Sequence, residues 1–187
     1  MAQKKSKLNP LSIVLTVLLI IGAIWFVSSF KDDIGAELAL GNTIQNGYSF
    51  YYPNNFTSKP IPGRDLAYYA ESGEFISVER NSEVKLPNGV NEAYCAAFAK
   101  VQSKPVTPEI KSEVLEVKVI DSNAKSEGCF YKTSFVSGTD DLIIESKALW
   151  SKETRDVLYL VNGTYSVKTA ASVKETINDA IMQFSLM

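Results

Sequence analysis

Hydrophobic positions are most concentrated near the start of the chain. The segment from Leu11 to Phe30 is twenty residues long and contains no charged side chain. At about 1.5 Å of rise per residue, a helix of this length spans roughly 30 Å, the thickness of the hydrocarbon core of a bilayer. Three lysines precede the segment without an acidic residue, whereas a lysine and two aspartates follow it. The positive-inside bias therefore predicts a single transmembrane helix over 11–30, with 1–10 as a basic cytoplasmic tail and the rest of the chain outside.

A cleaved signal peptide is the alternative interpretation of the same segment. Its basic start fits, but the apolar region of a signal peptide is usually about 7–15 residues long, which is shorter than this segment. Val27-Ser28-Ser29 offers small residues for cleavage, although the Ala-x-Ala pattern is absent. We therefore expect an uncleaved signal anchor that holds the protein in the cell membrane.

Residues 31–47 contain three glycines and no aromatic ring. This small, polar composition predicts a stalk, and we expect the folded extracytoplasmic domain over 48–187. Within the domain, runs of aromatic and β-branched residues bounded by turn residues predict strands. The strands are expected at 48–52, 66–70, 75–79, 114–120, 129–136, 142–150 and 157–161.

Two helices are predicted among and after these strands. Asn91 is typical of a helix N-cap, and Pro105 ends the helix that begins there. At the end of the chain, Ser172 and Glu175 have the spacing of a capping box, and apolar residues then recur at helical intervals. These elements together predict an α+β fold, in which an antiparallel sheet of six or seven strands packs against helices.

Charge and composition narrow the classes of function. The chain has a formal charge of −2, and the three lysines before the span supply +3, which leaves −5 for the remainder. An acidic domain is a poor candidate for binding nucleic acid, which requires clustered lysine and arginine.

The chain contains no histidine, and no two of its ten glycines lie closer than six residues. The first observation excludes serine and cysteine triads with a histidine base and zinc helices of the His-Glu-x-x-His type, and the second excludes glycine-rich phosphate loops. No catalytic, cofactor-binding or metal-ligating residue is therefore assigned, and the domain is predicted to be non-catalytic.

The two cysteines are 34 residues apart, Cys95 in the first predicted helix and Cys129 at the start of a strand. In an oxidising compartment such a pair favours a structural disulfide. Two buried free thiols are the alternative. A reactive thiol would need a base or cationic neighbour, and no histidine exists to supply it.

Aromatic residues gather at the start of the domain, where 48–75 holds eight of the chain's 20. Adjacent residues of a strand point to opposite faces. In each of the pairs Tyr51-Tyr52 and Tyr68-Tyr69 we therefore expect one exposed ring, and these four tyrosines form a candidate surface for a protein partner. The alternative is that the rings only fill and cover the first hairpin.

The two ends of the domain resemble those of the PsbP-like group. Gly47-Tyr48-Ser49-Phe50-Tyr51-Tyr52-Pro53-Asn54-Asn55-Phe56 is similar to the group's opening, Gly-x-x-Phe-x-Tyr-Pro-x-x-(Phe/Trp), and a strand followed by a helix ending near Leu186 is similar to its close. The group includes photosystem-associated subunits, a Ran-binding protein and bacterial extracytoplasmic proteins. The resemblance implies an antiparallel sheet with helices on both sides and a non-catalytic binding or assembly role. No calcium, manganese or Ran-binding residues can be placed on this sequence.

The predicted function is therefore that of a bacterial, single-pass membrane protein whose outer domain binds a protein partner in an envelope complex. A pilin-like subunit is one alternative, although the expected prepilin cleavage site and the glutamate at the start of the span are missing. A small surface hydrolase that works without histidine is the other.

Overall fold

The computed structural model of the protein describes residues 40–85, 89–105, 107–138, 140–153 and 156–187. The predicted tail, membrane span and first part of the stalk lie outside these residues. Within the described part of the chain, no helix combines the length and the apolar character needed to cross a bilayer.

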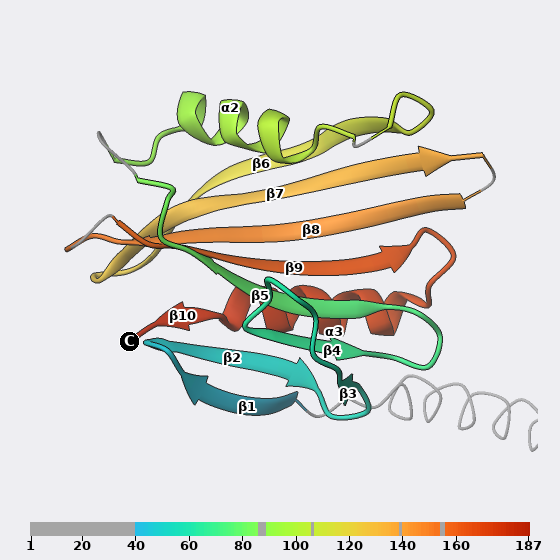
Figure 1. Cartoon of the computed structure of the whole chain (residues 1–187), viewed down its shortest axis with the longest axis horizontal. Coiled ribbons are helices and arrows are strands. Elements are labelled where there is room, and N and C mark those ends of the chain that lie inside the picture. The colour runs from blue at the N-terminus through green and yellow to red at the C-terminus, as the bar shows by residue number, and fades with distance from the viewer. Residues whose placement is uncertain (1–39, 86–88, 106, 139, 154–155) are drawn as a thin grey trace, which may run out of the picture. The chain divides into compact units, whose positions relative to one another are not determined.

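The described residues form ten strands and two helices, drawn in Figure 1. In chain order they are β1 (Leu40–Gln45), β2 (Tyr48–Pro53), β3 (Thr57–Ser58), β4 (Leu66–Tyr69), β5 (Phe75–Asn81), α2 (Glu92–Gln102), β6 (Lys111–Asn123), β7 (Ser126–Ser137), β8 (Asp140–Ser151), β9 (Leu158–Ser166), α3 (Ala171–Gln183) and β10 (Ser185–Leu186). All strand pairs are antiparallel. The predicted α+β class, with an antiparallel sheet and two helices, is therefore confirmed.

The strands make two sheets. A seven-stranded sheet has the order β3-β4-β5-β9-β8-β7-β6, and a three-stranded sheet has the order β1-β2-β10. Helix α2 lies along β6 and β7 (Figure 1), whereas α3 packs against β8 and β9 of the seven-stranded sheet and against β2 of the three-stranded one. Side chains alternate between the two faces of a strand, so the seven-stranded sheet has an α2 face and an α3 face.

Each face contributes to its own apolar cluster. Phe130, Val161 and Tyr165 point to the α3 face, where they pack with α3 and the aromatic rings of β2. Tyr131 and Leu160, one position along the same strands, point to the α2 face and pack with α2. The clusters share no buried residue, so the two faces have separate cores.

Residues 40–45, which the sequence assigned to the stalk, form β1 and pair with β2. The turn between the two strands consists of Asn46 and Gly47, with φ of 49° and 83°. Two successive positive φ values are typical of the type I′ turn that joins hairpin strands, and Asn-Gly is its preferred sequence. The sheet structure therefore begins at Leu40 rather than at Tyr48.

Strand β9 continues past Asn162-Gly163, where the sequence predicted that the strand would close. A Cβ atom on Gly163 would lie 2.3 Å from Ile177 Cγ2 of α3 and 2.8 Å from Ile181 Cδ1. The glycine is therefore required for the close approach of α3 to the sheet and does not mark a turn.

The N-caps of the two helices differ from each other. Asn91 caps α2 as predicted, because its side chain accepts a hydrogen bond from the backbone N–H of Tyr94 at 2.9 Å. The capping box predicted at Ser172 is wrong, since Ala170 occupies the N-cap of α3 and makes no side-chain cap. The stability of α3 therefore comes from its buried face, with Ile177, Ala180 and Ile181 packed on the sheet.

Candidate functional site

Helix α2 covers only part of its face of the sheet. Beyond its last residue, Gln102, the face is open as a hollow of about 190 Å³. We name this site the α2-face hollow. Strands β5, β7, β8 and β9 supply its floor, and the end of α2 supplies one wall. The eleven residues of α2 span about 16 Å, whereas the twelve residues of β7 beneath the helix span about 40 Å, so the helix covers only part of the strand.

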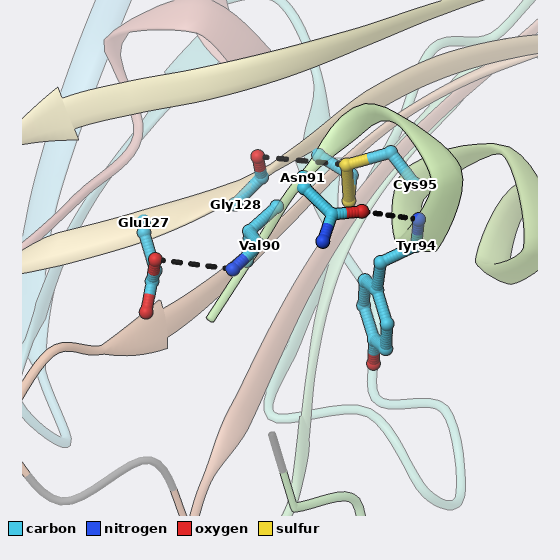
Figure 2. The surroundings of a disulfide bond; sticks show 7 residues. Val90, Asn91, Tyr94, Cys95, Glu127 and Gly128 are labelled. Carbon is cyan, nitrogen blue, oxygen red and sulfur yellow. Dashed lines mark hydrogen bonds between the residues drawn. A yellow bond between two sulfur atoms is a disulfide. The ribbon is translucent and has the colours of Figure 1, made fainter. Parts of the chain in front are cut away.

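The disulfide fixes the other end of α2 to the sheet (Figure 2). Cys95 and Cys129 are bonded, with their Cα atoms 5.5 Å apart, and both side chains are fully buried. Just before the helix, the backbone N–H of Val90 donates to Glu127 Oε2 at 3.2 Å. These links hold the start of α2 on β7 and so determine where the helix ends above the sheet.

The floor of the hollow contains apolar side chains, such as Ile144 and Leu160, together with several polar ones. Ser146 Oγ donates to Asn162 Oδ1 at 2.6 Å, which joins β8 to β9. Ser103, which follows α2, shares a hydrogen bond of 2.6 Å with Thr133 of β7, and both residues are buried. Hydroxyl and amide groups can donate and accept, so the floor retains hydrogen-bonding capacity toward a ligand.

Thr164, on β9, is the exception within this floor. Its side chain lines the hollow and is only 7% exposed, yet its Oγ1 has no hydrogen-bond partner among the described residues. A buried hydroxyl without a partner costs about 1–3 kcal/mol, and most buried polar groups in proteins are paired. The unpaired hydroxyl of Thr164 is therefore a marker of a position where a ligand group can supply the missing bond.

The rim of the hollow carries two charges of opposite sign. Arg64 Nη1 donates to Glu79 Oε2, and both side chains are about one-third exposed. Tyr131 also lines the hollow, and burial raises the pKa of its phenol to about 12, so it stays neutral. The hollow consequently carries no net charge.

Aromatic rings form the walls on either side. Phe75 and Phe135 both line the hollow. Behind Phe75, the ring of Tyr69 is stacked at 5.4 Å between centroids, and Lys59 Nζ lies 5.5 Å from the Tyr69 centroid. Tyr69, one of the four tyrosines of the candidate surface, thus adjoins the hollow.

The other three tyrosines of that surface lie toward the α3-face core. Tyr52 and Tyr68 stack on each other with centroids 4.0 Å apart and so join the two sheets. Tyr51, like these two, is half-buried and packs against the same cluster. The structure therefore does not bring the four tyrosines together as one surface.

Two charged side chains are buried on the α3 face, and both have partners. Glu145 accepts hydrogen bonds from Lys132 Nζ at 2.7 Å, Tyr165 Oη at 2.6 Å and Asn178 Nδ2 at 2.9 Å. Burial alone would raise the pKa of Glu145, but these hydrogen bonds outweigh it and lower the pKa. Such complete pairing indicates a structural role.

Lys147 is the other buried charge of this face. Its Nζ donates to the backbone carbonyls of Met182 at 2.7 Å and Phe184 at 2.8 Å, so it caps the C-terminus of α3. Burial lowers its pKa to about 8.

Among the described residues, no group of three or more histidine, cysteine, aspartate or glutamate side chains could hold a metal ion. The four predicted tyrosines and the disulfide are the site residues that sequence reasoning named, and it did not find the α2-face hollow. A signal was present in β9, where Asn162 and Thr164 share a face with the apolar Leu158 and Leu160. Polar residues on the buried face of a strand point to a polar site or to a hydrogen-bond network.

Comparisons with known proteins identify the fold and not the family. Neither the family models nor the curated proteins contain a match to this sequence. Among solved structures, the chain is similar to the Ran-binding protein Mog1p of Saccharomyces cerevisiae, with 11% identity over 79% of this chain and 96% of that one, and a TM-score of 0.54. A point mutant of Mog1 is similar at 10% identity, with the same coverage and TM-score. At such identity the likeness defines an α+β fold of the Mog1p type.

Proposed function

We propose that this chain is a membrane-anchored, extracytoplasmic binding module that joins an envelope complex and has no catalytic activity, and that the α2-face hollow is its binding site. The observation that carries the proposal is the buried Thr164 hydroxyl, which has no partner among the described residues and lies in the floor of a hollow without net charge. The twenty-residue apolar segment before the domain supplies the anchor. The resemblance to the PsbP-like group supports a binding role.

A binding site on this face agrees with how the fold is stabilised. The α3 face is covered by α3 and the three-stranded sheet, so its side chains serve the larger core. The α2 face is held by the disulfide at one end and is open at the other. A rigid, partly open sheet face allows a partner to bind without rearrangement of the core.

Site-specific photo-crosslinking in cells tests the site. A benzoylphenylalanine residue replaces Phe135 in the full-length chain, and the matched control carries it at Tyr51, an equally half-buried ring on the α3 side. We expect light-dependent adducts, detected by mass spectrometry, at Phe135 and not at Tyr51. Adducts at Tyr51 alone, or at neither position, would show that the hollow is not the binding site.

Fractionation of the same cells tests the anchor. The chain is expected to stay with membranes after an alkaline carbonate wash and to keep its basic N-terminal tail. A mature protein that begins near Phe30 and is recovered in the soluble fraction would contradict the anchor without affecting the crosslinking result.

A further inference from the structure

We infer that the α2-face hollow binds one neutral sugar ring, such as the terminal unit of a cell-envelope glycan. This inference rests on the proposed function, because it names the ligand class of the same site. It follows from the size of the hollow, its charge, its polar groups and its aromatic walls.

The size of the hollow selects a small ligand. Pockets for drug-sized molecules typically measure about 300–1,000 Å³, so this hollow takes something smaller. Its volume of about 190 Å³ corresponds to roughly six water molecules at about 30 Å³ each. This is space for a single six-membered ring with its substituents, and the rest of a glycan chain would extend into solvent.

The charges around the hollow select a neutral ligand. Arg64 and Glu79 are the charged residues among those described that line it, and they pair with each other. An anionic ligand at Arg64 would be repelled by the carboxylate of Glu79, and a cationic ligand at Glu79 would be repelled by the guanidinium of Arg64. A ligand without charge leaves the ion pair of Arg64 and Glu79 undisturbed and therefore binds at the lowest electrostatic cost.

The polar groups select a ligand rich in hydroxyls. Thr164 Oγ1 lacks a partner among the described residues, and Asn162 accepts from Ser146 through its Oδ1, while its Nδ2 is a donor that can face a ligand. A sugar hydroxyl can accept from Asn162 and can either donate to Thr164 or accept from it, so it fits both groups. A site built around such bonds discriminates strongly against ligands that lack the hydroxyl.

The aromatic walls suit the apolar C–H faces of a sugar ring. Phe75 and Phe135 line the hollow, and the stacked Tyr69 supports Phe75 from behind. Sugars present hydroxyls at the ring edge and C–H groups on the ring face. An aromatic wall beside a hydroxyl-lined floor matches both parts of that pattern.

Saturation-transfer NMR on the full-length chain tests the inference. The chain is placed in phosphatidylcholine nanodiscs, which avoid sugar-headed detergents, and is titrated with the methyl glycosides of glucose, galactose and N-acetylglucosamine. Acetate, methyl phosphate and methylammonium are the charged comparators. We expect at least one glycoside to bind and the three charged probes not to bind.

Two matched substitutions locate the binding. Thr164→Val keeps the shape of the side chain and removes its hydroxyl, and it should weaken glycoside binding about tenfold, the equivalent of one hydrogen bond. Thr43→Val makes the same change in β1, away from the hollow, and should leave binding unchanged. Glycoside binding that is insensitive to Thr164→Val would overturn the assignment to this hollow.

The remaining outcomes separate the inference from the proposed function. If no glycoside binds but crosslinking at Phe135 gives a protein adduct, the hollow is a protein-binding site and the sugar inference is wrong. Binding of a charged probe instead would also overturn it. If neither glycosides nor crosslinked adducts are found, both the inference and the proposed function fail.

Discussion

On the α3 face of the seven-stranded sheet the buried charges of Glu145 and Lys147 have hydrogen-bond partners, whereas on the α2 face the buried hydroxyls of Ser77 and Thr164 have none among the described residues. The α3 face is closed by a helix and a second sheet, so an unpaired charge there would be very costly. The α2 face is only partly covered, and it tolerates unpaired hydroxyls. The α2 face thus keeps two unpaired buried hydroxyls beside the paired side chains of Ser103, Thr133 and Ser146, whereas the buried charges of the α3 face are paired.

The largest expected effect on stability comes from removing the disulfide that links α2 to the sheet. Replacing Cys95 and Cys129 by alanine opens a loop closed over 34 residues, which costs about 3–4 kcal/mol in the chain-entropy model. Urea denaturation of the full chain measures the loss. Hydrogen exchange should rise more in α2 than in α3, because α3 is held by packing and by hydrogen bonds with Glu145 and Lys147, and not by the disulfide. Equal loss of protection in both helices would contradict the separation of the two faces.

On the α3 face, removing a paired charge should be destabilising. Glu145→Ala leaves Lys132, Tyr165 and Asn178 without their shared acceptor, and we expect a loss of about 3 kcal/mol in the free energy of unfolding. Glu175→Ala, on the exposed side of α3, is the matched control and should change stability by less than about 0.5 kcal/mol.

The lowered pKa of Glu145 also predicts how the free energy of unfolding changes in acid. The pKa of Glu145 is lower in the fold than in the unfolded chain. The ionised carboxylate therefore stabilises the fold fully at a pH above its unfolded pKa, and this stabilisation is lost as the pH falls through the folded pKa. The wild-type chain should therefore lose stability in acid more steeply than Glu145→Ala.

The buried Lys147 of the α3 face should make the free energy of unfolding depend on pH in alkaline solution. Its pKa is about 8 in the fold and near 10.5 when unfolded, so between these values the unfolded chain binds more protons. The free energy of unfolding should rise from pH 8 to pH 10, by on the order of 2 kcal/mol. Above pH 10 the rise should reverse, because burial raises the pKa of Tyr131 and Tyr165 to about 12 and the fold keeps their protons. The Lys147→Met variant should lack this rise in the free energy of unfolding. If the rise persisted in the variant, another titratable group would be its cause.

Most of the sheet could be predicted from strand patterns, because alternation and turn residues are local signals. Strands β2, β4, β5 and β8 lie where aromatic and β-branched runs predicted them, and Asn91 caps α2. Strand β1 was missed although Asn46-Gly47 is a strong hairpin signal, since the glycine-rich segment before it was assigned to a stalk.

The second half of β9 was missed for a different reason, and the same error concealed the site. Asn162-Gly163 is a turn signal in isolation, but here α3 packs against Gly163 and the strand runs on. Only a continuous β9 places Asn162 and Thr164 side by side on the α2 face with Ser146 of β8. The packing of α3 lies outside any local pattern, so the polar residues of β9 become a signal of the hollow only once the strand is known to continue past Gly163.

The smallest effects compare the two unpaired hydroxyls of the α2 face. Thr164→Val removes an unsatisfied buried hydroxyl without changing the shape of the side chain, and it should raise the free energy of unfolding by about 1 kcal/mol while it weakens ligand binding. A gain in stability with a loss of function is the usual consequence of changing a binding residue.

Ser77, fully buried on β5, does not line the hollow. Ser77→Ala should therefore raise stability by about 0.5–1 kcal/mol and leave glycoside binding and crosslinking at Phe135 unchanged. Thermal unfolding and NMR titration of both variants, side by side, separate a hydroxyl kept for binding from one that only weakens the fold. If Ser77→Ala weakened binding as much as Thr164→Val, ligand binding would depend on the packing of the whole α2 face. It would then not depend on direct contact between Thr164 and the ligand.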